Sequence, residues 1–499
     1  PLVKELALGN QELSARRLNV LLDRALAFAL LDRDSEALGA LRQAAERWPS
    51  PELARFVDSR GEFAKLRAHA EYQATQRSFR RFERYWDAPA FSGGFRSQLT
   101  EAERVAGLSR LWAEVKFSYA FPERLMEIGW DQLYLDWVPR VVAAQSTGDY
   151  YKELMLLCAR IRDGHTAVYP PRELDWSAKP PLRTVFVEGH VMIAEVLSPS
   201  LRETGILPGM EVRKVDGEDA VSYARREVEP YQSSSTPQDL EVRTFGYGFL
   251  RGASEQPVRL TVADSDGRER ERIVARSGYV DVERTPEFEW KMLPGGIAWV
   301  RLHSFASSHA AEQFIRQFDE IRAAGGLILD VRDNGGGDSG VGYEILRRLI
   351  DRPVKGSRSL LRRYRGTDRA RGTAMDWDEV DAPVIEPAVG PRFRGPVVVL
   401  SGAATFSAAE DFLVAWRNSG RGPIIGSKSG GSTGQPLYFT LPGGGSGRVC
   451  TKQDTFPDGG QWVGQGIAPD VEVHQTYRDM VRGADTVLNR AVLFFTSDK

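Results

Sequence analysis

Two short, continuous apolar runs most strongly constrain the fold of this chain. Residues 326–331 (GLILDV) and 396–402 (PVVVLSG) are each followed by a loop and then by a segment with helical spacing of apolar residues. Such a run is typical of a strand buried on both faces of a parallel sheet. The strand–loop–helix order recurs, and an amphipathic segment at 310–324 precedes the first run. We therefore predict a layered α/β core over residues 279–480.

The rest of the chain divides by its periodicity into four further regions. At 499 residues, the chain is long enough for about three domains. Apolar residues at three- and four-residue spacing predict a helical domain over 1–90 and a second helical region over 100–178. Alternating segments and an Asp-Gly hairpin turn predict a small β-domain over 180–277. The final residues, 481–499, are expected to form a helix or tail.

Composition excludes several classes of protein. Lys and Arg number 66 against 68 Asp and Glu, so no basic excess points to nucleic acid. Two cysteines cannot form a disulfide framework, and the six histidines include no pair with metal-ligand spacing, so we expect no metal and no cofactor. The most apolar early stretch is interrupted by Asp23 and Arg24, which argues against a membrane span. Because the chain begins at Pro1, we expect that an initiator Met or a leader has been removed.

The loops after the two apolar runs are the candidate functional segments, because α/β folds place their sites at the carboxyl ends of parallel strands. The first loop contains Gly335, Gly336 and Gly337, which could turn backbone N–H groups toward an oxyanion or could simply form a flexible turn. In the second loop, Ser407 stands three residues before Glu410. That spacing fits a helix capping box, and it also fits a nucleophile at a helix N-terminus.

A second serine matches a known nucleophile pattern and is rejected. Residues 430–434 (GGSTG) fit the G-x-S-x-G elbow, which requires a strand before it and a helix after it. The residues that follow, QPLYFTLP, are typical of a strand. We therefore do not expect Ser432 to be a nucleophile.

Three motifs in order carry a family resemblance: LILDVRDNGGG, VVVLSGAATFSAAEDF and GQGIAPDVEV. Together they resemble the C-terminal-processing (tail-specific) serine protease family, whose relatives include the tricorn protease core and retinoid-binding repeats. The resemblance implies a crotonase-like (ClpP/crotonase) α/β spiral core. The segment GILPGMEVRKVDGEDA resembles a PDZ signature, which implies a PDZ-like domain over 180–277. The N-terminal all-helical region lies outside the resemblance.

The resemblance implies roles for particular residues. Ser407 matches the family nucleophile, and the amides of Gly336 and Ala408 match its oxyanion donors. The bacterial processing branch has a lysine base about 25 residues after the serine, but here that position is Ser432. Lys428 lies nearby, out of register.

The missing lysine points to the tricorn-like branch, in which a histidine from an earlier helical segment is the base. Residues 162–166 (RDGHT) resemble its motif, so His165 is the expected base, carried by the helical region 100–178. The serine and glutamate that orient the histidine in that branch are absent at the expected positions. We therefore take Asp458 as the third catalytic residue, with Asp454 as the alternative, although either could be a turn residue.

The sequence thus predicts a serine peptidase that acts on a peptide or unfolded protein, with Ser407 forming an acyl-enzyme. A catalytically inactive binding protein on the same fold is the alternative, and an acyl-CoA enzyme of the crotonase type is the third hypothesis. The helical N-terminal region could mediate oligomerisation. The resemblance implies an exported or periplasmic location, with a cytoplasmic one also open.

Overall fold

A computed structural model describes residues 17–86, 88–89, 91, 93–276, 282–373 and 375–496. The chain forms two compact units, Pro1–Gly93 and Gly94–Lys499. The predicted helical residues 1–16 lie outside the described residues.

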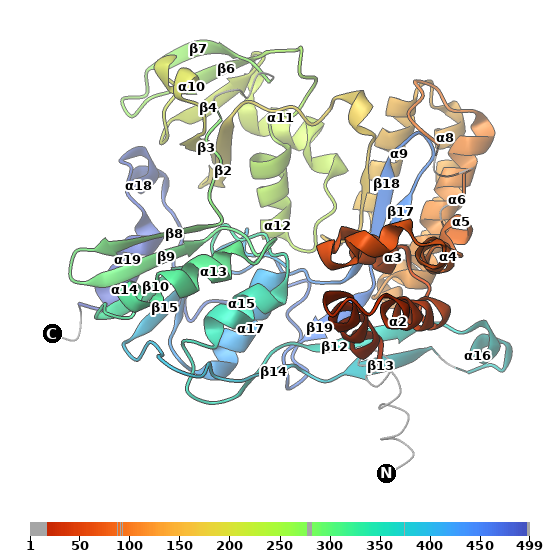
Figure 1. Cartoon of the computed structure of the whole chain (residues 1–499). Coiled ribbons are helices and arrows are strands. Elements are labelled where there is room, and N and C mark those ends of the chain that lie inside the picture. The colour runs from red at the N-terminus through yellow and green to blue at the C-terminus, as the bar shows by residue number, and fades with distance from the viewer. Residues whose placement is uncertain are drawn as a thin grey trace. The chain divides into compact units, whose positions relative to one another are not determined.

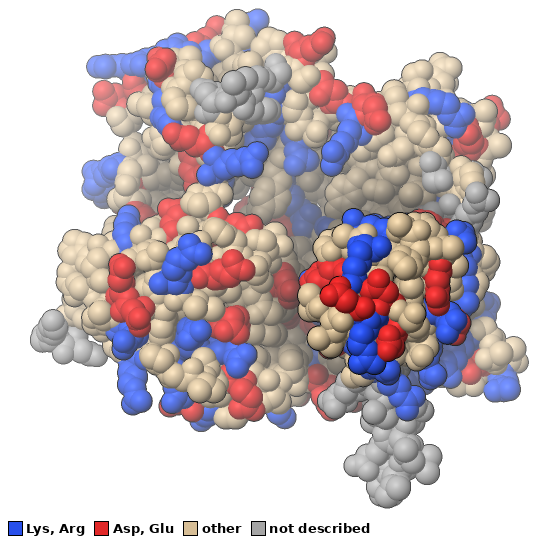
Figure 2. Space-filling model, viewed as in Figure 1, with Lys and Arg blue, Asp and Glu red and all other residues tan. Residues whose placement is uncertain are grey.

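The first unit is helical throughout its described part. A helix over 17–30 is followed by α2 (Asp34–Arg47), α3 (Pro51–Ser59), a 3-10 helix (Gly61–Ala68), α4 (Ala70–Phe79) and α5 (Glu83–Trp86). Their apolar faces bury one cluster that includes Leu41, Phe63, Tyr72 and Phe79. Figure 2 shows Lys, Arg, Asp and Glu side chains interspersed on the visible outer face of this unit.

A six-stranded sheet forms the centre of the second unit, in the order β20-β16-β15-β10-β9-β8. Its strands are β8 (Phe288–Leu293), β9 (Ile297–Leu302), β10 (Gly326–Asp330), β15 (Val397–Ser401), β16 (Ile424–Gly426) and β20 (Val471–Glu472). All neighbours pair in parallel except β8 and β9. Every residue of β10 and β15 is buried, which confirms the two predicted central strands.

Helices cover both faces of this sheet (Figure 1). On one face lie α13 (His309–Arg316), α14 (Phe318–Ile321), α15 (Ser339–Leu346) and α17 (Ala408–Ser419), which share a large apolar cluster with the sheet. On the other face α19 (Thr486–Phe494) packs against the central strands. A short helix, α18 (Tyr477–Val481), precedes it.

The β-rich segment forms an antiparallel sheet of its own, in the order β2-β3-β4-β6-β7, with β2 at one edge. The strands are β2 (Leu182–Val187), β3 (His190–Val196), β4 (Glu211–Val215), β6 (Val258–Ala263) and β7 (Glu269–Val274), and β5 (Glu218–Asp219) pairs with β4. Its helices are α10 (Pro199–Glu203), α11 (Ala220–Glu227), α12 (Pro237–Glu241) and the π-helix η4 (Val242–Gly248). We call residues 182–276 the β-unit.

The second helical region packs against two small sheets. It contains α6 (Glu101–Ser118), α7 (Pro122–Glu127), α8 (Trp130–Ala143) and α9 (Thr147–Ala159). One sheet has the order β1-β18-β17, from Ala167–Tyr169, Ser446–Cys450 and Pro436–Thr440. The other has the order β13-β12-β19, from Asp376–Val380, Arg358–Arg363 and Lys452–Thr455, with α16 (Gly366–Ala370) between β12 and β13. The remaining pair is β11 (Val354–Lys355) with β14 (Val384–Ile385).

The observed architecture is therefore a mixed α/β fold with helices and several sheets. Among the described residues, no helix is both long and apolar enough to cross a membrane.

Candidate active site

Ser407 sits immediately before α17 in a strained backbone conformation, with φ +58° and ψ −123°. A non-glycine residue in such a sparsely populated region costs about 1–3 kcal/mol and persists only where its surroundings hold it. Here the Ser407 amide donates to Glu410 Oε2 at 3.0 Å and to the Ser432 carbonyl at 3.1 Å. The Ser407 carbonyl accepts the amide of Glu410 at 2.7 Å. In this turn the Ser407 hydroxyl lies within hydrogen-bond reach of His165.

His165 lies in the loop between α9 and β1 and is buried. Its Nε2 is 3.1 Å from Ser407 Oγ, and its Nδ1 is 2.9 Å from Ser432 Oγ. Its backbone N–H donates to Asp163 Oδ1 at 2.8 Å. The imidazole stacks on Phe406, with ring centroids 4.8 Å apart and planes 11° from parallel. The ring is thus held by contacts on its face and at both nitrogens.

The environment of His165 disfavours its protonated form. Burial is the largest cause that lowers the pKa of the imidazole well below its ordinary value, and the charges of Arg448, Arg243 and Lys452 lower it further. A neutral imidazole can accept a proton at Nε2 while Nδ1–H donates to Ser432 Oγ. The histidine is therefore kept in the form that a general base requires.

Glu410 is the anchor that joins the serine turn to the segment 429–432. Its Oε1 accepts Ser429 Oγ at 2.6 Å and the Gly431 amide at 2.7 Å. Its Oε2 accepts the amides of Ser432 and Ser407, each at 3.0 Å. Burial raises the pKa of this carboxyl to about 8, and the four donors oppose that rise. One buried side chain therefore fixes both the nucleophile turn and the serine that contacts His165.

The glycine loop after β10 packs directly against the serine turn. Gly336 has φ +90°, and a Cβ added there would lie 2.6 Å from the Phe406 carbonyl oxygen and 2.8 Å from Ser407 Cβ. The Gly336 amide donates to Asn334 Oδ1 at 2.9 Å, and Asn334 Nδ2 donates to the Leu302 carbonyl at 3.0 Å. The loop is thus close enough to contribute to an oxyanion site, but in this structure the Gly336 amide bonds to Asn334.

Ala408 begins α17, directly after the serine. Among the described residues, its amide has no backbone hydrogen-bond acceptor. A Cβ at Gly336 would lie 2.9 Å from this nitrogen, so Ala408 N–H and Gly336 face the same small space beside Ser407. A free amide at a helix N-terminus can stabilise a developing negative charge.

The structure corrects the assignment of Asp458. This residue is exposed in a turn, and its Oδ1 accepts the Gly460 amide at 2.9 Å. The reason is local, since a Pro-Asp-Gly sequence favours a turn closed by the aspartate side chain. His165 Nδ1 instead meets Ser432 Oγ. The alternative, Asp454, is also elsewhere: it is buried in β19, 2.9 Å from Lys452 Nζ.

Ser432 is the site residue that the sequence missed. It does not lie in a strand–turn–helix elbow, because its loop leads into β17 rather than a helix. Its contact with His165 joins residues 267 positions apart, and no local pattern reports such a contact. The one available signal was its place in the register where the related branch has lysine. Lys428 is exposed, on the loop after β16.

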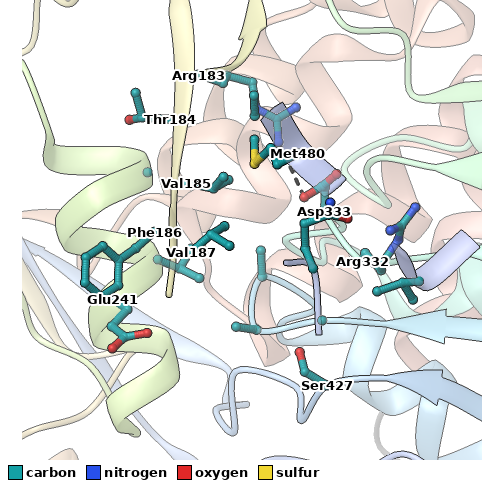
Figure 3. A pocket seen from close by; sticks show the side chains of 18 of the residues that line it. Arg183, Thr184, Val185, Phe186, Val187, Glu241, Arg332, Asp333, Ser427 and Met480 are labelled. Carbon is teal, nitrogen blue, oxygen red and sulfur yellow. Dashed lines mark ion pairs between the residues drawn. The ribbon is translucent and has the colours of Figure 1, made fainter. Parts of the chain in front are cut away.

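A groove of about 1440 Å³ borders these loops. One wall is the edge strand β2, from Arg183 to Val187, and part of η4, including Tyr247. The other wall includes residues 401–404, which lead to Ser407, and Asp333, which precedes the glycine loop. Figure 3 shows Arg183 pointing from the β-unit toward Asp333, and their ion pair measures 3.5 Å. The described residues contain no group of three or more His, Cys, Asp or Glu side chains that could hold a metal ion.

Comparisons with known proteins agree with the predicted resemblance. Residues 296–473 match the sequence profile of Peptidase family S41. The chain is 31% identical over 188 residues to a chloroplastic C-terminal processing peptidase of Tetradesmus obliquus, covering 36% of this chain and 37% of that protein. It is 28% identical over 307 residues to a putative tricorn protease homolog of Streptomyces coelicolor, covering 58% of this chain and 22% of that protein. The resemblance to C-terminal-processing and tricorn proteases is thereby confirmed, and the chain spans well under half the length of these relatives.

A solved structure shares the fold of the chain. Mature CPAF in complex with lactacystin superposes with a TM-score of 0.61 at 14% identity, covering 77% of this chain and 96% of CPAF. At this identity the likeness concerns the fold.

Gly336 should not tolerate a side chain, because φ +90° and the close approach of Ser407 both exclude one. We expect Gly336→Ala to lose at least about a hundredfold in the rate of Ser407 acylation, the scale of losing one oxyanion donor. Gly335→Ala is the matched control, since a Cβ there meets nothing within 4 Å. Equal rates for the two variants in a fluorophosphonate labelling assay would contradict the assignment.

Ser432→Ala should slow the same acylation roughly tenfold, because His165 loses the acceptor that orients its ring. The control is the His165→Ala background, in which Ser432→Ala should have no further effect, since Ser432 would act through the histidine. The test is a double-mutant cycle, in which the labelling rates of the wild type, the two single variants and the double variant are compared. Additive losses would show that Ser432 acts independently of His165.

Proposed function

We propose that the chain is a serine peptidase that cleaves peptide bonds through an acyl-enzyme on Ser407. The observation that carries this proposal is the 3.1 Å separation of Ser407 Oγ and His165 Nε2 in a buried site. Ser407 Oγ attacks the scissile carbonyl, and its proton passes to His165 Nε2 and then to the leaving amine. Water then attacks the acyl carbon while His165 accepts its proton, the bond from that carbon to Ser407 Oγ breaks, the carboxyl product leaves, and the proton returns from His165 to Ser407 Oγ.

Two backbone amides would stabilise the tetrahedral intermediate in this mechanism. Ala408 N–H at the start of α17 is the first donor, supported by the helix N-terminus. Gly336 N–H is the second, and it would share its hydrogen between Asn334 Oδ1 and the oxyanion. Ser432 Oγ takes the place of Asp458 as the group that orients the imidazole.

The proposed substrate is an extended peptide or unfolded protein that lies in the groove. We propose that the β-unit is PDZ-like and that the core is crotonase-like, with domains over 1–90, 100–178, 180–277, 279–480 and 481–499. A peptide would add as a strand to the edge of β2 and run toward Ser407 along residues 401–404. The support for this placement is that β2 is an edge strand whose successive residues 183–187 line the groove.

The 3.1 Å separation of Ser407 Oγ and His165 Nε2 also favours catalysis over the alternative, a catalytically inactive binding protein. A binding protein has no need to hold a serine hydroxyl within hydrogen-bond reach of a neutral histidine, or to strain the backbone at Ser407. By resemblance we also propose an exported location, tested by fractionation of cells, and oligomerisation through the helical residues 1–90, tested by light scattering of the full chain.

An alkylfluorophosphonate probe should label the wild-type chain at Ser407, because a serine activated by a neutral histidine attacks phosphorus as it would a carbonyl. We expect Ser407→Ala to lose labelling and His165→Ala to lose it at least a hundredfold. Ser427→Ala, which changes another serine in the groove, is the matched control and should label normally. Labelling of Ser407→Ala at the wild-type rate would remove the nucleophile assignment.

Peptidase activity should persist at acidic pH. The pKa of His165 is lowered by burial and by nearby cations, so its neutral, active form survives below the ordinary imidazole value of about 6.5. We expect the acid limb of the kcat/KM profile on a fluorogenic peptide to lie well below that value. An acid limb at or above it would contradict the assigned environment of the base.

A further inference from the structure

Two arginines from different parts of the second unit converge on one carbonyl beside His165. Arg243 Nη2 donates to the Gly164 carbonyl at 3.2 Å, and Arg448 Nη2 donates to the same oxygen at 2.9 Å. Arg243 belongs to η4 of the β-unit, whereas Arg448 belongs to β18. Because Gly164 immediately precedes His165, these two bonds fix the backbone from which the imidazole extends.

Arg243 is held in place from both sides. Its Nε lies 2.8 Å from each carboxylate oxygen of Asp239, one helical turn earlier. Its guanidinium carbon lies 5.1 Å from the ring centroid of Phe406, the ring on which His165 stacks. A Cβ at Gly164 would lie 3.0 Å from Arg243 Nη2 and 2.9 Å from Phe406 Cζ. Glycine at 164 thus allows the close approach of the arginine to the catalytic loop.

Serine and threonine side chains of the β-unit also form hydrogen bonds to the loop that carries His165 and to the loop that carries Ser432. Ser235 Oγ accepts the Gly164 amide at 2.9 Å, and Ser233 Oγ donates to the Asp163 carbonyl at 2.8 Å. Thr236 Oγ1 donates to the Gly430 carbonyl at 2.7 Å, next to the loop that carries Ser432. The segment 233–243 therefore reaches the histidine loop and the Ser432 loop together.

The charged and titratable groups around His165 come from every element packed against it. Its own loop contributes Asp163, the β-unit contributes Arg243 and Asp239, and α17 contributes Glu410. The strands β18 and β19 contribute Arg448, Lys452 and the Cys450 thiol. Among the described residues, neither ring nitrogen of His165 bonds to a carboxylate. Two of the three cations are themselves ion-paired, Arg243 with Asp239 and Lys452 with Asp454.

We infer that Arg243 and Arg448 form an arginine clamp that positions His165. The clamp acts in two ways, through the shared Gly164 carbonyl and through the two positive charges, which oppose protonation of the ring. Both arginines are positioning residues, since they act through the histidine. The inference rests on the proposed role of His165 as the base, but its electrostatic part can be measured without any catalysis.

The test is an NMR titration of the full chain with isotope-labelled histidine. The six histidines give few signals, and His165→Gln identifies the one that belongs to residue 165. We expect Arg243→Gln and Arg448→Gln each to move the titration midpoint of His165 upward, and the double variant to move it further. Arg243→Lys and Arg448→Lys keep the charge and should leave the midpoint low while losing the planar two-donor geometry.

The matched control is Arg348→Gln. Like Arg243, Arg348 lies over a phenylalanine ring, with its guanidinium carbon 5.5 Å from the centroid of Phe318. This variant should leave the His165 midpoint unchanged. An unchanged midpoint in both Gln variants that remain folded, or a Lys variant that rises as far as its Gln counterpart, would overturn the inference. If a Gln variant does not fold, the corresponding Met variant keeps the apolar stem without the charge and replaces it.

Fluorophosphonate labelling of Ser407 separates this inference from the proposed function. At about pH 5 the Gln variants should label several-fold more slowly than the wild type, and at about pH 8 the difference should narrow, because the imidazole is then neutral in every variant. A wild-type chain that fails to label would refute the proposed function while the NMR midpoints still test the clamp. A labelled wild type whose Gln variants show the same pH dependence would overturn the clamp alone.

Discussion

The carboxylate of Glu410 is the contact on which the rest of the site depends. A serine at φ +58° cannot hold its conformation by itself, and the segment that carries Ser432 has no regular secondary structure. Glu410 meets both needs, because its two oxygens accept donors from Ser407 and from residues 429–432. The buried carboxyl group of Glu410 is well satisfied by its four donors. If this group were absent, several backbone amides would lose their hydrogen-bond acceptor. The first turn of α17 therefore builds the site as well as the helix.

The histidine that contacts Ser407 and Ser432 comes from a distant part of the chain. His165 stands 242 residues before the serine that it contacts and arrives on a loop of the helical region. That loop is braced by the β-unit through residues 233–243 and by the core through Arg448. The same β-unit lines the groove, and Arg183 of β2 pairs with Asp333 beside the glycine loop. The β-unit thus supports both the histidine loop and the groove.

The charges around the imidazole differ from those in a Ser-His-Asp triad. In such a triad a buried aspartate stabilises the imidazolium that forms during the reaction. Here Nδ1 meets a neutral hydroxyl, and three cations lie nearby. This environment stabilises the neutral base in the resting state and gives less support to its protonated form. In the proposed mechanism, we therefore expect the site to tolerate acid and to lack the stabilisation that an aspartate supplies to the imidazolium.

The sequence by itself determined the features that depend on neighbouring residues. Continuous apolar runs identified β10 and β15, alternation identified the strands of the β-unit, and ordered motifs identified the family resemblance. They also pointed to Ser407, Gly336, Ala408 and His165, which the fold brings together. Only the tertiary structure decided what His165 Nδ1 contacts. Asp458 lies close to the expected place in the motif, but its own turn takes its carboxylate, while Ser432 reaches the ring across 267 residues. Side-chain contacts between distant loops depend on how whole layers pack, and a local pattern does not record that packing.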